Sequence, residues 1–154
     1  MSVTFSYELT GIGWATCTIR VGEQAKTVTA SYLSDALADL ASAAAAALRG
    51  HPRPCASFID EPGEYRWILG PRSGGRVRIQ ILEFGQFWRR RPDEEGVVLF
   101  DGECRLRTFA GAIVSELQRL KKEHGIEGYR QKWVKYEFPE ARLEELEELL
   151  KAPS

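Results

Sequence analysis

The residues best suited to molecular recognition form one short run. Trp88 is followed directly by Arg89, Arg90 and Arg91. Tryptophan and arginine are the residue types enriched at the energetic centres of protein interfaces. Two interpretations are open: either this run binds another protein from an exposed loop, or Trp88 folds back into the core while the arginines pair with the acidic residues 93–95 that follow.

Two further arginines are expected on the polar face of a β-hairpin. Arg66 and Arg78 lie in arms whose apolar and polar residues alternate. Guanidinium groups in a row can bind carboxylates or phosphates, so we expect a secondary binding patch there. Ordinary solvation of a sheet edge is the alternative. Nucleic acid is a disfavoured partner because Tyr65 and Trp67, the aromatic residues of this hairpin, fall on its other face.

Four carboxylates form an alternative candidate site. Asp60 and Glu64 flank one tight turn, and Asp101 and Glu103 project from the same side of a later strand. Paired carboxylates can perform acid–base catalysis or hold a hard metal ion. Solvation of turns explains the same residues. The catalytic interpretation predicts that the four converge in a pocket between sheet and helices, in an enzyme or a small-ligand-binding protein.

The chain lacks the motifs of the common cofactor and metal sites. It contains no G-x-x-x-x-G-K phosphate loop, no H-E-x-x-H zinc helix and no G-x-S-x-G nucleophile turn, so we expect no cofactor and no metal. The three cysteines, Cys17, Cys55 and Cys104, are odd in number and widely spaced, which disfavours disulfide and zinc frameworks. We expect each to be a buried, inert thiol.

The composition is that of an ordinary globular domain, and we expect a single domain over residues 1–154. Apolar residues make up 44% and charged residues 28%, and the formal net charge of −1 gives no global attraction to nucleic acid or to an anionic membrane. We find neither the basic head and apolar run of a signal peptide nor the roughly 20 apolar residues of a membrane span. The cytoplasm is therefore the expected location.

Alternation with period two predicts about seven strands. They cover residues 2–9, 14–21, 26–32 and 55–60, two hairpin arms within residues 61–84, and residues 97–105. In the hairpin, a three-residue loop that ends at a left-handed Gly74 would set Trp67 opposite Ile79. The apolar face should line the core, and the polar face, which carries Glu64 and Arg66, should stay in water.

Helices are predicted from spacings of three and four. The first covers residues 35–49 with Ser34 as its N-cap, the second covers residues 106–125, and the last begins at Pro139. Residues 129–136 fit either a short helix or an irregular crossing segment. This order of elements, βββα-ββββ-αα, predicts an α+β fold: a largely antiparallel sheet with helices packed on one face.

Two runs carry a family resemblance: A-S-Y-L-S-D-A-L at residues 30–37 and E-P-G-E-Y-R-W at residues 61–67. They resemble small uncharacterised α+β proteins of actinomycete-type bacteria, which implies a bacterial origin. The layout of meander, helix, meander and C-terminal helices is similar in outline to immunity proteins of bacterial toxin systems, which implies a toxin as partner. We therefore expect a non-enzymatic, cytoplasmic domain that binds another protein or itself as a homodimer.

Overall fold

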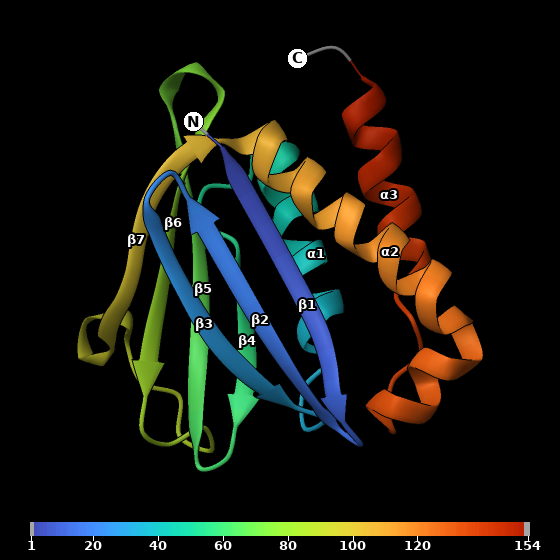
Figure 1. Ribbon diagram of the computed structural model, residues 1–154. Helices are drawn as coiled ribbons and strands as arrows, with labels where there is room; N and C mark the ends of the chain where they lie inside the picture. Colours follow the sequence, from blue (N-terminus) through green and yellow to red (C-terminus); the bar gives the residue numbers. More distant parts are fainter. Residues whose placement is uncertain (1, 153–154) are drawn as a thin grey trace.

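The computed structural model describes residues 2–152 and confirms the α+β class and the predicted order of elements (Figure 1). The elements are β1 (Val3–Gly11), β2 (Trp14–Val21), β3 (Gln24–Ser31), α1 (Ala36–Leu48), β4 (Cys55–Asp60), β5 (Gly63–Arg72), β6 (Arg76–Phe84), β7 (Val97–Arg105), α2 (Leu106–Trp133) and α3 (Glu140–Lys151). No helix within the described residues is both long and apolar enough to cross a membrane.

The strands divide between two antiparallel sheets. One has the order β1-β2-β3 and the other the order β4-β5-β6-β7, so each sheet is a meander of sequential neighbours. α2 lies along β1, α1 packs against β4 and β5, and α3 packs against both other helices (Figure 1). The helices therefore cover the edge strand β1 of one sheet and the edge strand β4 of the other.

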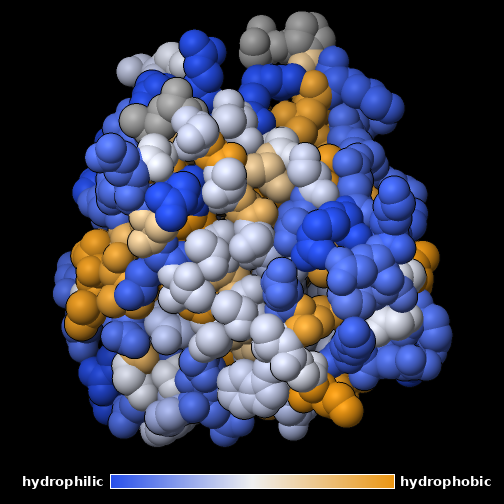
Figure 2. All heavy atoms as spheres, in the orientation of Figure 1, coloured by the Kyte–Doolittle hydropathy of each residue, from blue (hydrophilic) through white to orange (hydrophobic). Residues whose placement is uncertain are grey.

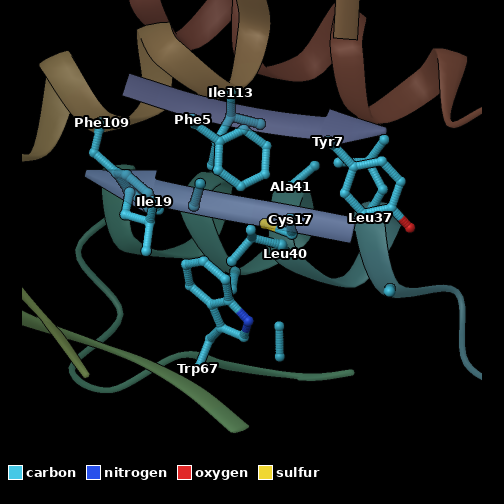
Figure 3. Packing of buried hydrophobic residues seen from close by; sticks show 14 of the residues in the cluster. Phe5, Tyr7, Cys17, Ile19, Leu37, Leu40, Ala41, Trp67, Phe109 and Ile113 are labelled. Atoms are coloured by element: carbon cyan, nitrogen blue, oxygen red, sulfur yellow. The ribbon is translucent and has the colours of Figure 1, made fainter. Parts of the chain in front are cut away.

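Both sheets and all three helices contribute to one apolar core. Phe5 of β1 faces Trp67 of β5 across the space between the sheets, with ring centroids 6.3 Å apart. Leu40 of α1 enters the same space and lies between Phe5 and Trp67 in Figure 3, whereas Leu37 lies beside Tyr7. Burial of aromatic and branched apolar surface on this scale is the main stabilising term of such a domain.

The hairpin of β5 and β6 has the predicted faces but not the predicted register. Trp67 pairs with Ile81 and not with Ile79, because the loop is Ser73–Gly75, one residue later than expected. Two consecutive glycines, Gly74 and Gly75, adopt φ values of 73° and 72°, which only glycine takes at little cost, and they move the turn. The resulting shift in pairing is two residues, so every side chain keeps its face.

Side chains of α2 satisfy the free edge of β1. Glu116 Oε2 accepts a hydrogen bond of 2.6 Å from the backbone N–H of Tyr7, and Arg119 Nη2 donates one of 3.0 Å to the carbonyl of the same residue. Arg119 also pairs with Glu116 through Nε at 2.8 Å. At Tyr7, an ion pair on the helix thus takes the place that a neighbouring strand would occupy.

Hydroxyl groups satisfy the edge of β4 in a similar way. Ser31 Oγ donates to the carbonyl of Ile59 at 2.9 Å, and Ser34 Oγ accepts from the N–H of Ile59 at 3.2 Å. Thr29 Oγ1 donates to Asp60 Oδ2 at 2.5 Å. The expectation that Ser34 caps α1 is therefore wrong, because its hydroxyl bonds to β4 and the helix begins after Asp35 without a side-chain cap.

α2 changes direction at Gly125, where the predicted helix ends. Gly125 has φ 70° and ψ 172°, which interrupts the helical backbone. The chain then resumes a helical course to Trp133, so the short-helix interpretation is correct for residues 129–133, whereas residues 134–136 are irregular. Tyr129 and Trp133, one turn apart, are both fully buried, and the turn between β1 and β2 is tied to this segment by a bond of 2.7 Å from Gly13 N–H to the Lys132 carbonyl.

Val134 closes α2 in a strained conformation. Its φ of 80° and ψ of −59° define a γ-turn, and the carbonyl of Trp133 accepts the expected bond from the N–H of Lys135 at 3.0 Å. Such a turn is rare, and a β-branched residue is poorly suited to positive φ. The tight packing of Trp133 on one side of the turn, with its ring 6.3 Å from that of Tyr7, holds the backbone in place.

The cysteines are in two environments. Cys17 and Cys104 are buried as expected, and burial raises the pKa of the Cys17 thiol well above its ordinary value. Cys55 is exposed, so the expectation of a buried thiol is wrong there. Cys55 is the first residue of the outer strand β4, and its side chain lies beside α1 at the surface.

Replacing Glu116 by Ala should lower the free energy of unfolding by roughly 2–3 kcal/mol, because the buried N–H of Tyr7 loses a charged acceptor. Glu116→Gln should be milder, since an amide oxygen can still accept. Urea denaturation measures both changes. The matched control is Glu123→Ala, which removes the exposed partner of Arg119 and should cost at most about 0.5 kcal/mol. Equal effects of the Glu116→Ala and Glu123→Ala changes would contradict this account of the β1 edge.

Replacing Val134 by Gly should stabilise the protein by up to about 1 kcal/mol, because relief of the γ-turn strain exceeds the backbone entropy that glycine adds to the unfolded chain. Thermal denaturation should show a higher Tm. The control is Lys135→Gly at the next position. Lys135 does not have positive φ, so this variant should be less stable than the wild type. A fall in Tm for both variants would show that Val134 is not strained.

Candidate functional site

The arginine-rich run lies in the loop of residues 85–96, which joins β6 to β7. This loop lies against the outer face of the four-stranded sheet. Its backbone is fixed by a bond of 3.0 Å from the N–H of Phe87 to the carbonyl of Pro62. At its end, Gly96 lies so close to the ring of Phe84 that a Cβ there would come within 2.8 Å of it. The loop is thus packed onto the sheet at both ends.

Arg66 is the anchor of this loop and not part of a surface patch. Arg66 is only 1% exposed, and its Nη1 donates to the carbonyl of Arg91 and to Asp93 Oδ1, both at 2.8 Å. The guanidinium also lies 4.1 Å from the centre of the Phe84 ring. Burial alone would lower the pKa of Arg66, but its bonds to Asp93 and Glu64 raise the pKa above the ordinary value.

The expectation of a fully wet outer face is therefore wrong at Glu64 and Arg66. Glu64 is buried as well, with Oε2 3.3 Å from Nε of Arg66 and accepting a bond of 2.7 Å from Ser57. The reason is the loop itself, which covers the half of the sheet where Ile68 and Phe84 form a small second apolar cluster with Leu82. Removing a charged group from water is costly unless opposite charges surround it, and the two carboxylates beside Arg66 supply those charges.

Trp88 is exposed, so the interpretation that it folds back into the core is wrong. Trp88 is 63% exposed, and its ring makes an edge contact with the ring of Phe87, with the centroids 5.5 Å apart. Arg91 pairs with Glu95 at 2.9 Å, as the alternative interpretation expected for the arginines. Arg89 and Arg90 are exposed and form no ion pair with any residue in 2–152. The loop therefore presents one tryptophan and two uncompensated arginines to solvent.

Arg78 lies on the same face as Arg66 but outside the loop. It binds Asp101 with two bonds, Nε to Oδ1 at 2.8 Å and Nη2 to Oδ2 at 2.5 Å, and these bonds lower the pKa of Asp101. Arg76 pairs with Glu103 at 3.0 Å in the next row. In each pair, an arginine of β6 and a carboxylate of β7 neutralise each other, and both pairs are partly exposed. Arg78 therefore does not extend the unpaired positive charge of Arg89 and Arg90.

The four candidate carboxylates do not converge. Asp60 and Glu64 line a depression of about 470 Å³ at the end of the four-stranded sheet, together with Glu61 and Glu83. Asp101 and Glu103 are instead engaged by the arginines of β6. In the part of the chain that the structure describes, no three side chains of His, Cys, Asp or Glu are grouped so that they could hold a metal ion. Asp60 and Glu64 are themselves bonded to Thr29 and Arg66.

Two exposed valines next to the loop were missed by sequence reasoning. Val97 and Val98, at the start of the outer strand β7, are 61% and 54% exposed. Figure 2 shows the corresponding apolar patch at the left, over the beginning of β7. The signal was present, because four consecutive apolar residues, Val97 to Phe100, cannot all face inward from one strand.

A shallow groove on the other side of the loop was also missed. It has a volume of about 450 Å³ and lies between α1 and β4, where Ala43, Ala46 and Cys55 form part of its wall. Arg90 lines it from the loop. No sequence signal joins these residues, because they come from three segments that only the fold brings together.

Comparisons of the chain with protein-family models, with curated proteins and with solved structures give no match. The geometry of the loop is therefore what indicates its role. That geometry is an exposed Trp88 with Arg89 and Arg90 beside it, on a support fixed by Arg66.

Replacing Arg66 by Met should lower the free energy of unfolding by about 3–5 kcal/mol, because Glu64 is left buried without its partner. Amide hydrogen exchange in residues 85–96 should speed up, since the carbonyl of Arg91 and the side chain of Asp93 are released. Arg78→Met on the same face is the control and should change neither by much, because its pair with Asp101 is partly exposed. Unchanged exchange in Arg66→Met would show that the loop does not depend on this anchor.

Proposed function

We propose that the protein is a non-enzymatic binding domain that recognises another protein through the loop of residues 85–96. The observation that carries the proposal is the exposure of Trp88, 63%, on a loop that is packed rather than loose. Tryptophan is enriched at protein interfaces, where its ring supplies a large apolar contact area and its N–H group a polar contact. The flanking Arg89 and Arg90 supply the second residue type that is enriched in interface centres.

The support of the loop favours binding over a chance exposure. The buried guanidinium of Arg66 donates hydrogen bonds to the Arg91 carbonyl and to Asp93, and so fixes the backbone on the C-terminal side of Trp88. The Phe87 N–H fixes the other side through Pro62. A loop held at both ends loses little conformational entropy when a partner binds, which is how a small surface can reach useful affinity.

The charge of the loop favours a partner with an acidic surface. Arg91 is neutralised by Glu95 within the loop, whereas Arg89 and Arg90 are not paired within residues 2–152. Two arginines beside an aromatic side chain suit a site of carboxylates next to an apolar depression. The exposed Val97 and Val98 at the start of β7 extend the apolar part of this surface.

A protein toxin is the partner class that the outline similarity to immunity proteins implies, and a second copy of the chain is the alternative partner. The cytoplasm is the proposed location, because the three cysteines are free thiols, as expected in a reducing compartment. Both statements extend the same proposal: the loop binds protein, and the identity of that protein follows from the experiment.

Replacing Trp88 by Ala should leave Tm unchanged and weaken partner binding by roughly 30-fold or more, the effect of losing a hot-spot side chain of about 2 kcal/mol or more. The partner is first captured from an extract of the source cells with a photo-crosslinking residue at position 88, and its affinity is then measured with purified proteins. The charge reversal Arg89→Glu with Arg90→Glu should weaken binding further and reduce its salt dependence.

The control is Trp14→Ala, which removes another exposed tryptophan, from β2, far from this loop in the chain. It should bind as the wild type does. Sedimentation of the purified protein decides whether the partner is a second copy, because a homodimer through the loop would dissociate in Trp88→Ala. A large loss of Tm in Trp88→Ala, or equal binding by Trp88→Ala and wild type, would overturn the proposal.

A further inference from the structure

A group of polar atoms lies unpartnered inside the protein, where the start of α1 meets β1 and the second half of α2. Within the described residues, the hydroxyls of Tyr7 and Tyr129, the indole N–H of Trp133 and Oδ1 of Asp35 are buried and have no hydrogen-bond partner among the protein atoms. Tyr7, Tyr129 and Trp133 are fully buried residues. Buried polar groups without a partner are rare in native proteins, so four in one region require an explanation.

The side chains of this group are neighbours. The rings of Tyr7 and Trp133 are in edge contact at 6.3 Å, and Tyr129 lies one helical turn before Trp133 on the same inward face. Figure 3 shows the hydroxyl of Tyr7 pointing to the first turn of α1, beside Leu37. Asp35 immediately precedes that turn. Burial raises the pKa of both tyrosines, and the nearby carboxylate of Asp35 raises each pKa further.

The start of α1 adds unsatisfied donors to the same place. The first N–H groups of a helix have no partner within it. No side chain caps this helix, because Ser34 is bonded to β4 and Asp35 makes no cap bond. Ala36 and Leu37, the first two residues, are fully buried. The first turn therefore needs an acceptor, and no side chain of residues 2–152 provides one.

The charges around these atoms select the chemistry of what can bind there. The partial positive charge of the α1 N-terminus disfavours a cation, and the carboxylate of Asp35, with Asp39 one turn later, disfavours an anion. The occupant must accept bonds from N–H and O–H groups and also donate to Asp35. A small neutral molecule that does both is water, which commonly bridges buried polar groups through about three hydrogen bonds.

We propose that Tyr7, Tyr129, Trp133 and Asp35 form an internal water site at the N-terminus of α1, in which at least one ordered water molecule caps the helix and joins it to β1 and to the segment of α2 after Gly125. The site makes hydration part of the contact among these three elements. The water takes the place of the side-chain cap that Ser34 does not supply.

The test is a water-to-protein NMR experiment on the wild-type protein, supported by a high-resolution crystal structure. Cross-peaks with the sign of a long-lived water molecule are expected at the amide protons of Ala36 and Leu37 and at the indole proton of Trp133. The crystal structure should show a water oxygen within hydrogen-bond distance of at least three of the four side-chain atoms. Direct bonds among these side chains without a water molecule, or an ion in its place, would overturn the proposal.

A pair of variants separates the site from hydration elsewhere. Tyr129→Phe removes one ligand and should weaken or abolish the water cross-peak at the Trp133 indole, whereas Tyr32→Phe, at an exposed tyrosine, should leave it intact. Unaltered cross-peaks in Tyr129→Phe would contradict the assignment of Tyr129 to the site. If Tyr129→Phe does not fold, the wild-type measurement alone decides.

Discussion

The structure depends on how the free edges of its two sheets are satisfied. A strand edge exposes N–H and C=O groups that must find partners when they are buried. At β1 the partners of Tyr7 are Glu116 and Arg119, and at β4 the partners of Ile59 are Ser31 and Ser34. Side chains rather than strands fill these positions, and α2 packs against β1 while α1 packs against β4.

The same rule of pairing buried polar groups explains the candidate binding loop. Arg66 is buried on the outer face, so its guanidinium must be surrounded by acceptors, and those acceptors are Glu64, Asp93 and the carbonyl of Arg91. Satisfying Arg66 therefore places the loop, and the placed loop leaves Trp88 outside. A surface feature with a proposed role in recognition is in this way a product of the internal electrostatics of the sheet.

Much of the fold follows from the sequence, because alternation and helical spacing are local signals. The strands, their faces, the helices and the break at Gly125 were predicted from such patterns. The errors lie where distant segments meet. Burial of Arg66 depends on a loop that begins 19 residues later, so no local pattern reveals it. Ser34 resembles a helix cap, yet β4 competes for its hydroxyl. The burial of Glu116 could have been recognised from the sequence, because this charged residue lies on the apolar stripe of its helix, between Ile113 and Leu120. For the binding loop, the residue types pointed to Trp88, but only packing decides its exposure.

The exposed thiol of Cys55 also makes the protein convenient to follow by fluorescence. Cys17 and Cys104 are buried, so a maleimide dye should attach to Cys55 alone, and no engineered residue is required. Cys55 lines the groove that Arg90 also lines, which places the dye beside the loop without replacing any of its residues. The natural chain therefore already carries a reporter position for events at this surface.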